Sequence, residues 1–270
     1  MIGFNYLGKL GQLGNQMFQY AAVKGIAANK GYNYCIPNHK DVLVDTLGNK
    51  LKIELFNVFK MSNCSALNIQ FIDQNRPSIE ESGFHFNESI FNECPDWVNL
   101  FGFYQTEKYF KNIEDEIRQD FEFIDEYHKP CVEMIAGVEN PVAIHIRRGD
   151  FLKNSGNHHN LSITYYEKAL SMFDADRNVV IFSDDPQWCK DQKVFSDDRF
   201  LVSEGNSSYV DLCLMSLCSD FIIANSTFSW WGAWLANRGK VIAPSVWFGP
   251  NNAHLDIKDL YPEGWEVVDE

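Results

Sequence analysis

Two adjacent arginines, Arg147 and Arg148, follow directly on an apolar strand pattern in the segment 142-VAIHIRRGDF-151. Like charges held side by side repel each other unless anionic groups lie near them. Arginine binds phosphate through two parallel hydrogen bonds, so a phosphate-bearing ligand is one interpretation of the pair. Surface ion pairs with the many acidic residues of the chain are the other. Because side chains alternate along a strand, the two arginines cannot both face the same way, and one of them can be structural.

His145 lies two residues before Arg147 and therefore shares a face of the predicted strand with it. A lone histidine in a strand is usually a core residue. A histidine placed next to a phosphate-binding arginine is better interpreted as a ligand contact.

Polar residues also follow two other predicted strands. The strand at 179–183 ends in Ser183, Asp184 and Asp185, which either cap the next helix or accept hydrogen bonds from a base or a ribose. The strand at 220–224 leads into a helix start with four hydrogen-bonding side chains, namely Asn225, Ser226, Thr227 and Ser229. Free N–H groups at a helix start bind anions, and an ordinary helix cap is the alternative interpretation.

A glycine-containing loop, 11-GQLGNQMFQYA-21, follows a further strand at 2–6. Gly11 and Gly14 allow close backbone approach, and Asn15 and Gln16 stand where a helix begins. The spacing is not G-x-G-x-x-G, so a nicotinamide dinucleotide site is poorly supported, and a plain turn with a helix cap is the alternative. Together with the double arginine, these strand ends favour a ligand that carries two phosphate groups.

The second half of the chain alternates strand and helix patterns, which predicts a parallel sheet covered on both faces. The expected strands are 142–147, 179–183, 199–203, 220–224 and 240–244, and the expected helices are 163–173, 186–193, 207–218 and 228–238. In the first half we expect strands at 2–6 and 32–36 and helices at 15–30 and 104–123, and the pattern at 40–100 is mixed. The segment 125–141, with Pro130, Gly137 and Pro141, is the expected domain boundary. We therefore predict two Rossmann-like α/β domains, 1–130 and 131–270, that face each other across a cleft, with ligands beyond the carboxyl ends of the strands.

The bulk composition excludes several classes of partner. A formal net charge of −14 argues against nucleic acid and anionic membrane, because both need a basic surface. The chain has no apolar run of about 20 residues and no signal-peptide pattern, so we expect no transmembrane segment and a cytoplasmic location, with peripheral association at the inner membrane face left open. Seven cysteines without a CxxC pair predict neither a disulfide framework nor a zinc site.

Four motifs, 11-GQLGNQMFQYA-21, 145-HIRRGD-150, 182-FSDDPQWC-189 and 211-DLCLMSLCSDFIIANSTFSWWGAWL-235, resemble in this order those of glycosyltransferase family 11, the α-1,2-fucosyltransferases. The His-x-Arg-Arg-x-Asp element is shared with α-1,6- and protein O-fucosyltransferases, whereas the last motif is far more specific. The resemblance implies a GT-B fold, GDP-β-L-fucose as donor, and inverting transfer to O2 of a terminal galactoside without an essential metal or other cofactor. It also implies two partners, a nucleotide sugar and an oligosaccharide or glycolipid acceptor.

The resemblance carries roles to individual residues. Arg147 would hold the β-phosphate, His145 and Asp211 would lie near the guanine, Thr227 and Ser229 would contact the diphosphate, and Asn15 with the Gly11–Gly14 loop would face the fucose and the phosphates. Asp150 would orient Arg147 or Arg148. The base glutamate proposed for the α-1,6 enzymes cannot be carried over, because the segment 151-FLKNSGNHHNLSITYY-166 has no acid. Asp150, His158 and His159 are the local candidates for the base, and we expect acceptor contacts from residues 40–110.

Three alternatives stay open at this point. A metal-dependent GT-A enzyme would use the D-x-D in 174-DADR-177, but this segment leads into the incoming end of a strand, on the wrong side of the sheet. A non-catalytic nucleotide-sugar or glycan-binding module would keep the donor contacts without turnover. A related enzyme could use another GDP-sugar or form another linkage.

Overall fold

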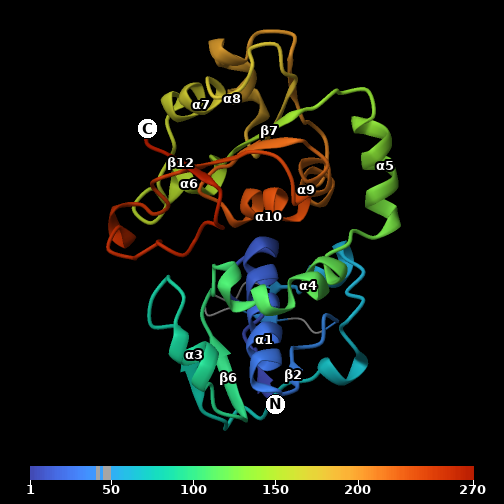
Figure 1. Ribbon diagram of the computed structural model, residues 1–270, viewed down its shortest axis with the longest axis vertical. Coiled ribbons are helices and arrows are strands. Elements are labelled where there is room, and N and C mark those ends of the chain that lie inside the picture. Colours follow the sequence, from blue (N-terminus) through green and yellow to red (C-terminus); the bar gives the residue numbers. More distant parts are fainter. Residues whose placement is uncertain (41–42, 45–49) are drawn as a thin grey trace. The chain divides into compact units, whose positions relative to one another are not determined.

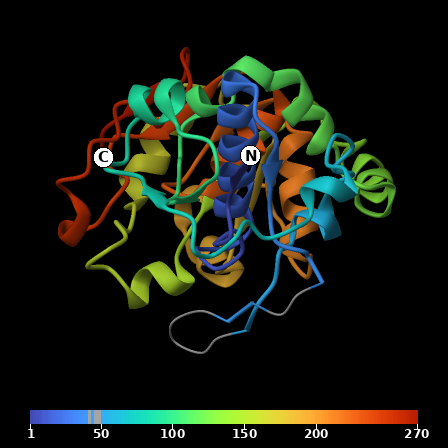
Figure 2. The same cartoon turned by 90° about the horizontal axis from the view of Figure 1, so that it is seen from below.

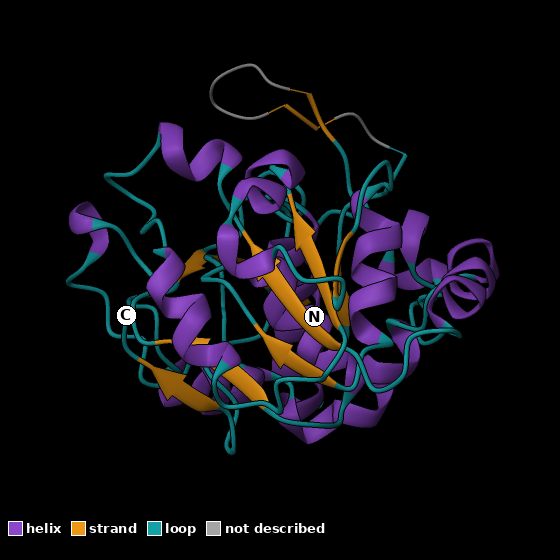
Figure 3. Ribbon diagram, turned by 90° about the horizontal axis from the view of Figure 1, so that it is seen from above, coloured by secondary structure: helices purple, strands orange, loops and turns teal. Residues whose placement is uncertain are grey.

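The computed structural model describes residues 1–40, 43–44 and 50–270. The chain divides into two compact units, Met1–Ile124 with Asp256–Pro262, and Asp125–Leu255 with Glu263–Glu270. Each unit contains a parallel β-sheet flanked by helices (Figures 1 and 3).

The sheet of the second unit has the strand order β12-β11-β10-β7-β8-β9, and all its neighbours pair in parallel. Its strands are β7 (Val142–Ile146), β8 (Val179–Ser183), β9 (Phe200–Val202), β10 (Asp220–Ile222), β11 (Val241–Pro244) and β12 (Glu266–Val268). Its helices are α5 (Asp125–Ile135), α6 (Gly149–Lys153), α7 (Ile163–Leu170), α8 (Pro186–Asp191), α9 (Ser208–Ser216) and α10 (Thr227–Ala236), with 3-10 turns η4 (Lys193–Phe195) and η5 (Pro250–Asn252). The five strands and four helices expected in this half are confirmed to within a few residues. The edge strand β12 and the short helix α6 were not predicted, because neither has an apolar run or a clear period.

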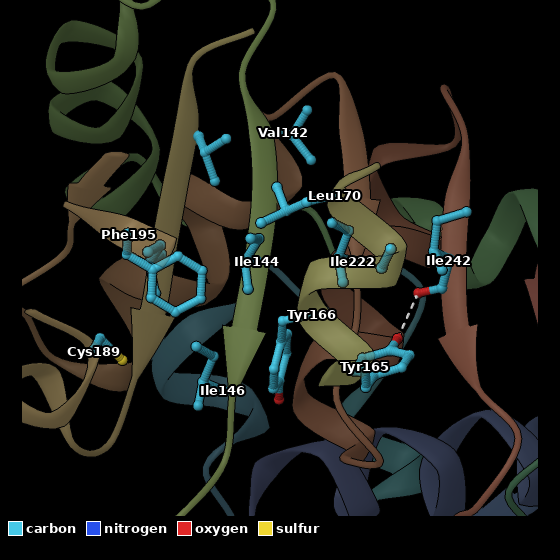
Figure 4. Close-up of a cluster of buried hydrophobic side chains, with 13 residues drawn as sticks. Val142, Ile144, Ile146, Tyr165, Tyr166, Leu170, Cys189, Phe195, Ile222 and Ile242 are labelled. Atoms are coloured by element: carbon cyan, nitrogen blue, oxygen red, sulfur yellow. Dashed lines mark hydrogen bonds between the residues drawn. The ribbon is translucent and has the colours of Figure 1, made fainter. Parts of the chain in front are cut away.

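The core of the second unit explains why β7 reads as a continuous apolar run. One face of the sheet packs on α7, where Tyr165 and Tyr166 meet Ile144, Ile146 and Ile222 (Figure 4). The hydroxyl of Tyr165 donates to the carbonyl oxygens of Ile223 and Ile242, at 2.7 and 3.3 Å, so a buried polar group is satisfied between two strands. On the opposite face, the rings of His145 and Phe228 lie 5.2 Å apart, which places α10 there. All five residues of β7 are buried as a result.

The division between the units follows residue 124 rather than residue 130, which corrects the expected boundary. Segment 125–135 forms α5 in spite of Pro130, and this helix packs within the second unit. The rings of Tyr127 and Tyr209 lie 5.7 Å apart, and Cys131 Sγ donates to the carbonyl oxygen of Val210 at 3.7 Å. A second correction is that Asp256–Pro262 belongs to the first unit, where Asp259 accepts a hydrogen bond from the backbone N–H of Phe86.

The first unit has a four-stranded parallel sheet in the order β2-β1-β6-β5. Its strands are β1 (Ile2–Gly3), β2 (Tyr34–Cys35), β5 (Ser78–Glu80) and β6 (Val98–Phe101), and a separate antiparallel pair is formed by β3 (Leu43–Val44) and β4 (Lys50–Leu51). Its helices are α1 (Leu13–Lys30), α2 (Leu55–Val58), α3 (Glu88–Glu93) and α4 (Glu114–Asp120), with 3-10 turns η1 (Ala66–Asn68), η2 (Glu107–Tyr109) and η3 (Lys111–Ile113). Helix α1 packs along β1 and β2 (Figure 2). It ends at Gly31, which adopts a left-handed conformation with φ 67°.

The expected helix at 104–123 is wrong in its first part. Only Glu114–Asp120 is an α-helix, and residues 107–113 form two 3-10 turns instead. Phe110 separates the two turns with φ −136°, outside the helical range. The expected strands at 2–6 and 32–36 are confirmed in shortened form. Part of the expected acceptor region, 41–42 and 45–49, lies outside the described residues.

None of the described helices combines the length and the apolar character needed to cross a lipid bilayer. All seven cysteines are free thiols.

Candidate functional site

Arg147 stands at the carboxyl end of β7 and is held by two carboxylates. Its Nη2 lies 2.8 Å from Asp150 Oδ1, and its Nε lies 3.3 Å from Asp184 Oδ2. The guanidinium also lies over the ring of Phe151, at 5.6 Å from the centroid. Its Nε is buried and makes no hydrogen bond of good geometry with any described residue. Arg147 therefore keeps donor capacity for a ligand, within a side chain that is only 21% exposed.

Arg148 has a different environment, as the alternation of side chains along a strand requires. Its guanidinium stacks on Trp188 at 3.9 Å from the ring centroid, and its Nε lies 3.2 Å from Asp185 Oδ2. Asp185 also caps α8 by accepting from the backbone N–H of Trp188. Arg148 is therefore packed and paired inside the second unit, and Arg147 is the arginine available for an anion.

Asp184 joins the two strand ends. Its Oδ1 accepts the backbone N–H of Arg148 at 2.8 Å, while its Oδ2 is the atom close to Arg147. A Cβ at Gly149 would lie 2.8 Å from Asp184 Oδ2, so a side chain there would displace this carboxylate. Ser183 Oγ accepts the backbone N–H of Asp185 at 3.0 Å. Ser183 and Asp184 thus shape the site from β8, and their first hydrogen bonds go to the protein itself.

His145 is 4% exposed and packs on Phe228, and its Nδ1 has no hydrogen-bond partner among the described residues. Burial, with a smaller effect from the charge of Arg147, lowers the pKa of His145 to about 3. The imidazole is therefore neutral near pH 7, and its Nδ1 remains without a hydrogen bond in the described structure.

The start of α10 combines structural and available polar groups. Asn225 donates from Nδ2 to the carbonyl oxygens of His159 and Trp247, both at 2.9 Å, and Ser229 is fully buried with its hydroxyl on Ala224 and Ser226 carbonyls. Ser226 caps the helix by accepting from the backbone N–H of Phe228. Thr227, half-buried in the first turn, makes no side-chain hydrogen bond within the described part of the chain. Thr227 therefore keeps its whole hydroxyl for a ligand, and Ser226, whose Oγ only accepts, keeps its O–H hydrogen within the described part of the chain.

Asp211 lies in the first turn of α9, and its Oδ1 accepts from Ser203 Oγ at 2.6 Å. Asn206 donates to the same Ser203 oxygen at 2.9 Å, and burial raises the pKa of Asp211 above its ordinary value. Ser203 and Asn206 also line a cavity of about 260 Å³ in the second unit, whose other walls come mainly from apolar residues of α5, β8, β9 and α9. This cavity has apolar walls and a few polar groups, as small-molecule sites in general do.

The two loop histidines differ in what they contact. His158 stacks on Phe151 with ring centroids 4.1 Å apart, beside Arg147. Burial lowers the pKa of His158, Asp150 opposes this effect, and Arg147 adds to it. His159 instead lies 3.0 Å from the side chain of Glu270 through Nε2. Asp150, 56% exposed, pairs with Arg147 as expected for an orienting acid.

The glycine loop and its neighbours belong to the first unit. Gly11 has φ +95°, and a side chain there would collide with Asn15. Asn15 Oδ1 accepts from Gln105 Nε2 at 2.8 Å. Gly14 is buried in the first turn of α1. Gln16 is structural, because its amide donates to the carbonyl oxygen of Lys52 and accepts the backbone N–H of Glu54.

Trp188 and Gln105 are among the residues of these environments that were not predicted. Trp188 lies within the quoted motif 182-FSDDPQWC-189, but its stacking on Arg148 depends on tertiary packing. Gln105 gave no signal, because its segment was interpreted as a helix.

The acidic pair Asp174 and Asp176 lies away from this group. Both residues are exposed in the turn between α7 and β8, at the amino end of β8, whereas Arg147 and Asp184 lie at the carboxyl ends of their strands. Arg177 in the same turn pairs with Asp220 at 2.6 Å. The turn is thus part of the strand connection on the opposite edge of the sheet.

Comparisons with known proteins agree with this arrangement. An alpha-1,2-colitosyltransferase of Escherichia coli is 32% identical over 292 aligned residues, which cover 96% of this chain and 97% of that protein. A galactoside alpha-(1,2)-fucosyltransferase 1 of Bos taurus is 25% identical, and the alignment covers 92% of this chain and 70% of that protein.

Solved structures share the fold at low sequence identity. POFUT1 in complex with GDP-fucose superposes with a TM-score of 0.56 at 13% identity, covering 88% of this chain and 94% of that chain. A variant of Arabidopsis thaliana FUT1 in complex with GDP gives a TM-score of 0.57 at 10% identity, and the superposition covers 97% of this chain and 74% of that chain. The fold is thus of the GT-B type, with two Rossmann-like units.

The sequence model of the family described as "Glycosyl transferase family 11" matches residues 2–269. The expected family, fold type and enzyme class are therefore confirmed, and the chain belongs to glycosyltransferase family 11.

Proposed function

We propose that this enzyme transfers L-fucose from GDP-β-L-fucose to O2 of a terminal galactoside, with inversion and without a metal ion. The observation that carries the proposal is the environment of Arg147, a cation at the carboxyl end of β7 that two carboxylates orient and whose buried Nε makes no hydrogen bond with a described residue. The α-(1,2) transferases among the relatives, together with the GDP and GDP-fucose complexes among the structural neighbours, support the donor class and the linkage.

In the proposed reaction, the acceptor hydroxyl oxygen bonds to C1 of the sugar as the bond from C1 to the β-phosphate oxygen breaks. The hydroxyl proton leaves to a base, and GDP departs with the electron pair of the broken bond. Negative charge therefore grows on the diphosphate in the transition state. The guanidinium of Arg147 and the first turn of α10 at Thr227 would stabilise that charge. Asp150 and Asp184 fix the guanidinium in advance, so little reorganisation accompanies the reaction.

The base is proposed among Asp150, His158 and His159. His158 fits this role better than His159, because it lies beside Arg147 and is neutral near pH 7, whereas His159 Nε2 is bound to Glu270. We propose that the guanine contacts Asp211 and His145, with the cavity beside Ser203 and Asn206 next to Asp211.

A second donor is favoured by one specific observation. The Escherichia coli relative that aligns with this chain over 97% of its length is named a colitosyltransferase. Colitose differs from fucose by the absence of the 3-hydroxyl. GDP-colitose is therefore the alternative donor. A site that hydrogen-bonds the 3-hydroxyl would reject GDP-colitose strongly, whereas a site with an apolar wall there would accept both.

The test is a transfer assay in which lactose is offered with GDP-fucose, with GDP-colitose, and with an equal mixture, each with and without EDTA. The proposal predicts an α-1,2-linked product from GDP-fucose that is unaffected by EDTA, with the linkage read by NMR. Preferential use of GDP-colitose in the mixture would replace the donor. GDP binding without transfer or hydrolysis of either donor would contradict the proposed reaction, and loss of activity in EDTA would contradict the metal-free mechanism.

A further inference from the structure

The first unit carries a cluster of amide side chains at the carboxyl end of its sheet, formed by Asn15, Gln19 and Gln105. Gln105 follows β6, and Nε2 of its amide donates to Asn15 Oδ1 at 2.8 Å. Gln19 lies one turn after Asn15 on α1 and donates to the carbonyl oxygens of Leu10 and Gly102, at 3.0 and 3.3 Å. The cluster thus ties the glycine loop to the segment after β6.

The cluster leaves two acceptors without donors. The Oε1 atoms of Gln19 and Gln105 are buried and have no hydrogen-bond partner in the described chain, and the two residues are 0% and 5% exposed. A buried unpaired carbonyl oxygen costs about 1–3 kcal/mol, so such atoms are usually satisfied by a ligand or a water. On the outer side, Asn15 is half-buried and Gly11 is exposed. Asn15 Nδ2 makes no hydrogen bond with a described residue, so a free donor lies near the free acceptor of Gln105.

The conformation that presents Gln105 is held by Glu81. Both carboxylate oxygens of Glu81 accept backbone N–H groups, from Phe103 at 2.8 Å and from Tyr104 at 3.0 Å. Gly102 with φ +151° leaves room for this carboxylate, because a Cβ there would lie 2.5 Å from Glu81 Cβ. Tyr104, next to Gln105, adopts a positive φ of 54°. A turn fixed in this way places the Gln105 amide before any ligand arrives.

We propose that Asn15 and Gln105 form a subsite for a pyranose hydroxyl, with Gln105 Oε1 accepting its proton and Asn15 Nδ2 donating to its oxygen. A hydroxyl both donates and accepts, which matches this donor–acceptor pair, whereas a phosphate near pH 7 offers acceptors only and would leave Oε1 unpaired. The sugar is either the acceptor galactoside or the transferred sugar of the donor. The identity of the bound sugar rests on the proposed function, whereas the existence of the subsite does not.

The experiment compares wild type with Gln105→Met, which keeps the length of the side chain but removes both polar atoms, and with Gln105→Glu, which keeps an acceptor at that position. Gln70→Met is the matched control, because Gln70 is exposed in the same unit and its side chain, among the described residues, bonds only the carbonyl oxygen of Leu67. The KM values for lactose and GDP-fucose and the Kd for GDP are measured for each protein, with circular dichroism to verify folding.

We expect Gln105→Met to lower kcat/KM about tenfold or more, with a rise in the KM of only one of the two substrates, lactose or GDP-fucose. Gln105→Glu should retain more activity than Gln105→Met. The affinity for GDP should stay at the wild-type value in both variants. A rise in KM for lactose would assign the subsite to the acceptor, and a rise in KM for GDP-fucose would assign it to the donor sugar. Equal losses in both variants, unchanged kinetics in Gln105→Met, or a parallel loss of GDP affinity would each overturn the proposal.

Saturation-transfer NMR with lactose and with methyl β-L-fucoside keeps this test independent of turnover. If wild type transfers nothing from GDP-fucose, the proposed function fails while the subsite is still measured. Saturation of one sugar by wild type and its loss in Gln105→Met would support the subsite, and no saturation of either sugar by wild type would overturn it.

Discussion

Asp184, which follows β8, contacts two consecutive residues that follow β7. Its Oδ2 lies 3.3 Å from Arg147 Nε, and its Oδ1 accepts a hydrogen bond from the backbone N–H of Arg148. One carboxylate thus fixes both the chain direction after β7 and the orientation of the arginine. The consequence is that substitutions at Arg147 and Asp184 act on the same proposed contact to the leaving diphosphate.

Arg147→Ala is expected to lower kcat roughly 10²–10³-fold while the protein stays folded, because it removes the proposed preorganised contact to the leaving diphosphate. The measurement is steady-state transfer from GDP-fucose, with thermal unfolding in parallel. Arg199→Ala is the matched control, since Arg199 lies at the amino end of β9 on the ring of Phe200. Near-normal turnover in Arg147→Ala would remove this residue from the mechanism.

Asp184→Asn keeps an acceptor for the backbone N–H of Arg148 but removes the charge beside Arg147. We expect a loss of about tenfold in kcat/KM, in the range of a partly buried ion pair. A double-mutant cycle with Arg147→Ala measures the coupling. If the two losses add fully, Asp184 does not act through Arg147.

Glu81→Gln is expected to change how stability depends on pH. Burial raises the pKa of Glu81 from 4.5 to about 7, against the effect of its hydrogen bonds from Tyr104 and Phe103. Because the folded pKa is the higher one, the folded state binds the proton more tightly. Wild type should therefore lose stability as pH rises from 4.5 to 7, by at most roughly 3 kcal/mol.

Urea unfolding at a series of pH values checks this expectation. Glu81→Gln should lack the slope, and Glu80→Gln, at the exposed neighbouring position, should keep it. An identical slope in wild type and Glu81→Gln would mean that the carboxylate ionises as it does in the unfolded chain.

His145 predicts a dependence on pH of the opposite sign. Its pKa is lowered to about 3, so the unfolded chain takes up a proton below pH 6.5 that the folded chain does not. Stability contributed by the neutral ring is present above pH 6.5 and is lost as pH falls toward 3. In NMR spectra, the ring resonances of His145 should not shift between pH 8 and pH 5, whereas titration of that ring within this interval would show that it is accessible to protonation.

The sequence was most informative where local pattern and tertiary role coincide. The strands of the second unit are buried runs followed by capping residues, so β7, β8 and α8 could be placed to within a residue or two. The residues after β7 and β8 meet as the rule that the carboxyl ends of parallel strands share one edge predicts, since Arg147 lies near Asp184 and Arg148 near Asp185.

The predictions that differ from the structure concern side chains whose hydrogen bonds go to residues distant in the sequence, and no local pattern encodes such contacts. The role of Gln16 comes from the backbone at Lys52 and Glu54, and that of Asn225 comes from the carbonyl oxygens of His159 and Trp247. Both side chains look available in the sequence, and both are used internally. Gln105 was missed for the converse reason, since its segment has a helical period and the turn there depends on the distant carboxylate of Glu81.

The return of Asp256–Pro262 to the first unit has a consequence for dissecting this enzyme. The chain passes between the units after residues 124, 255 and 262, so neither unit is a continuous segment. A single proteolytic cut after residue 124 would leave a carboxyl-terminal fragment that still carries Asp259, the partner of Lys108 and of the Phe86 backbone. The two fragments would then remain associated without a covalent link, and a fragment expressed from residue 125 onward would expose a segment that belongs to the missing half.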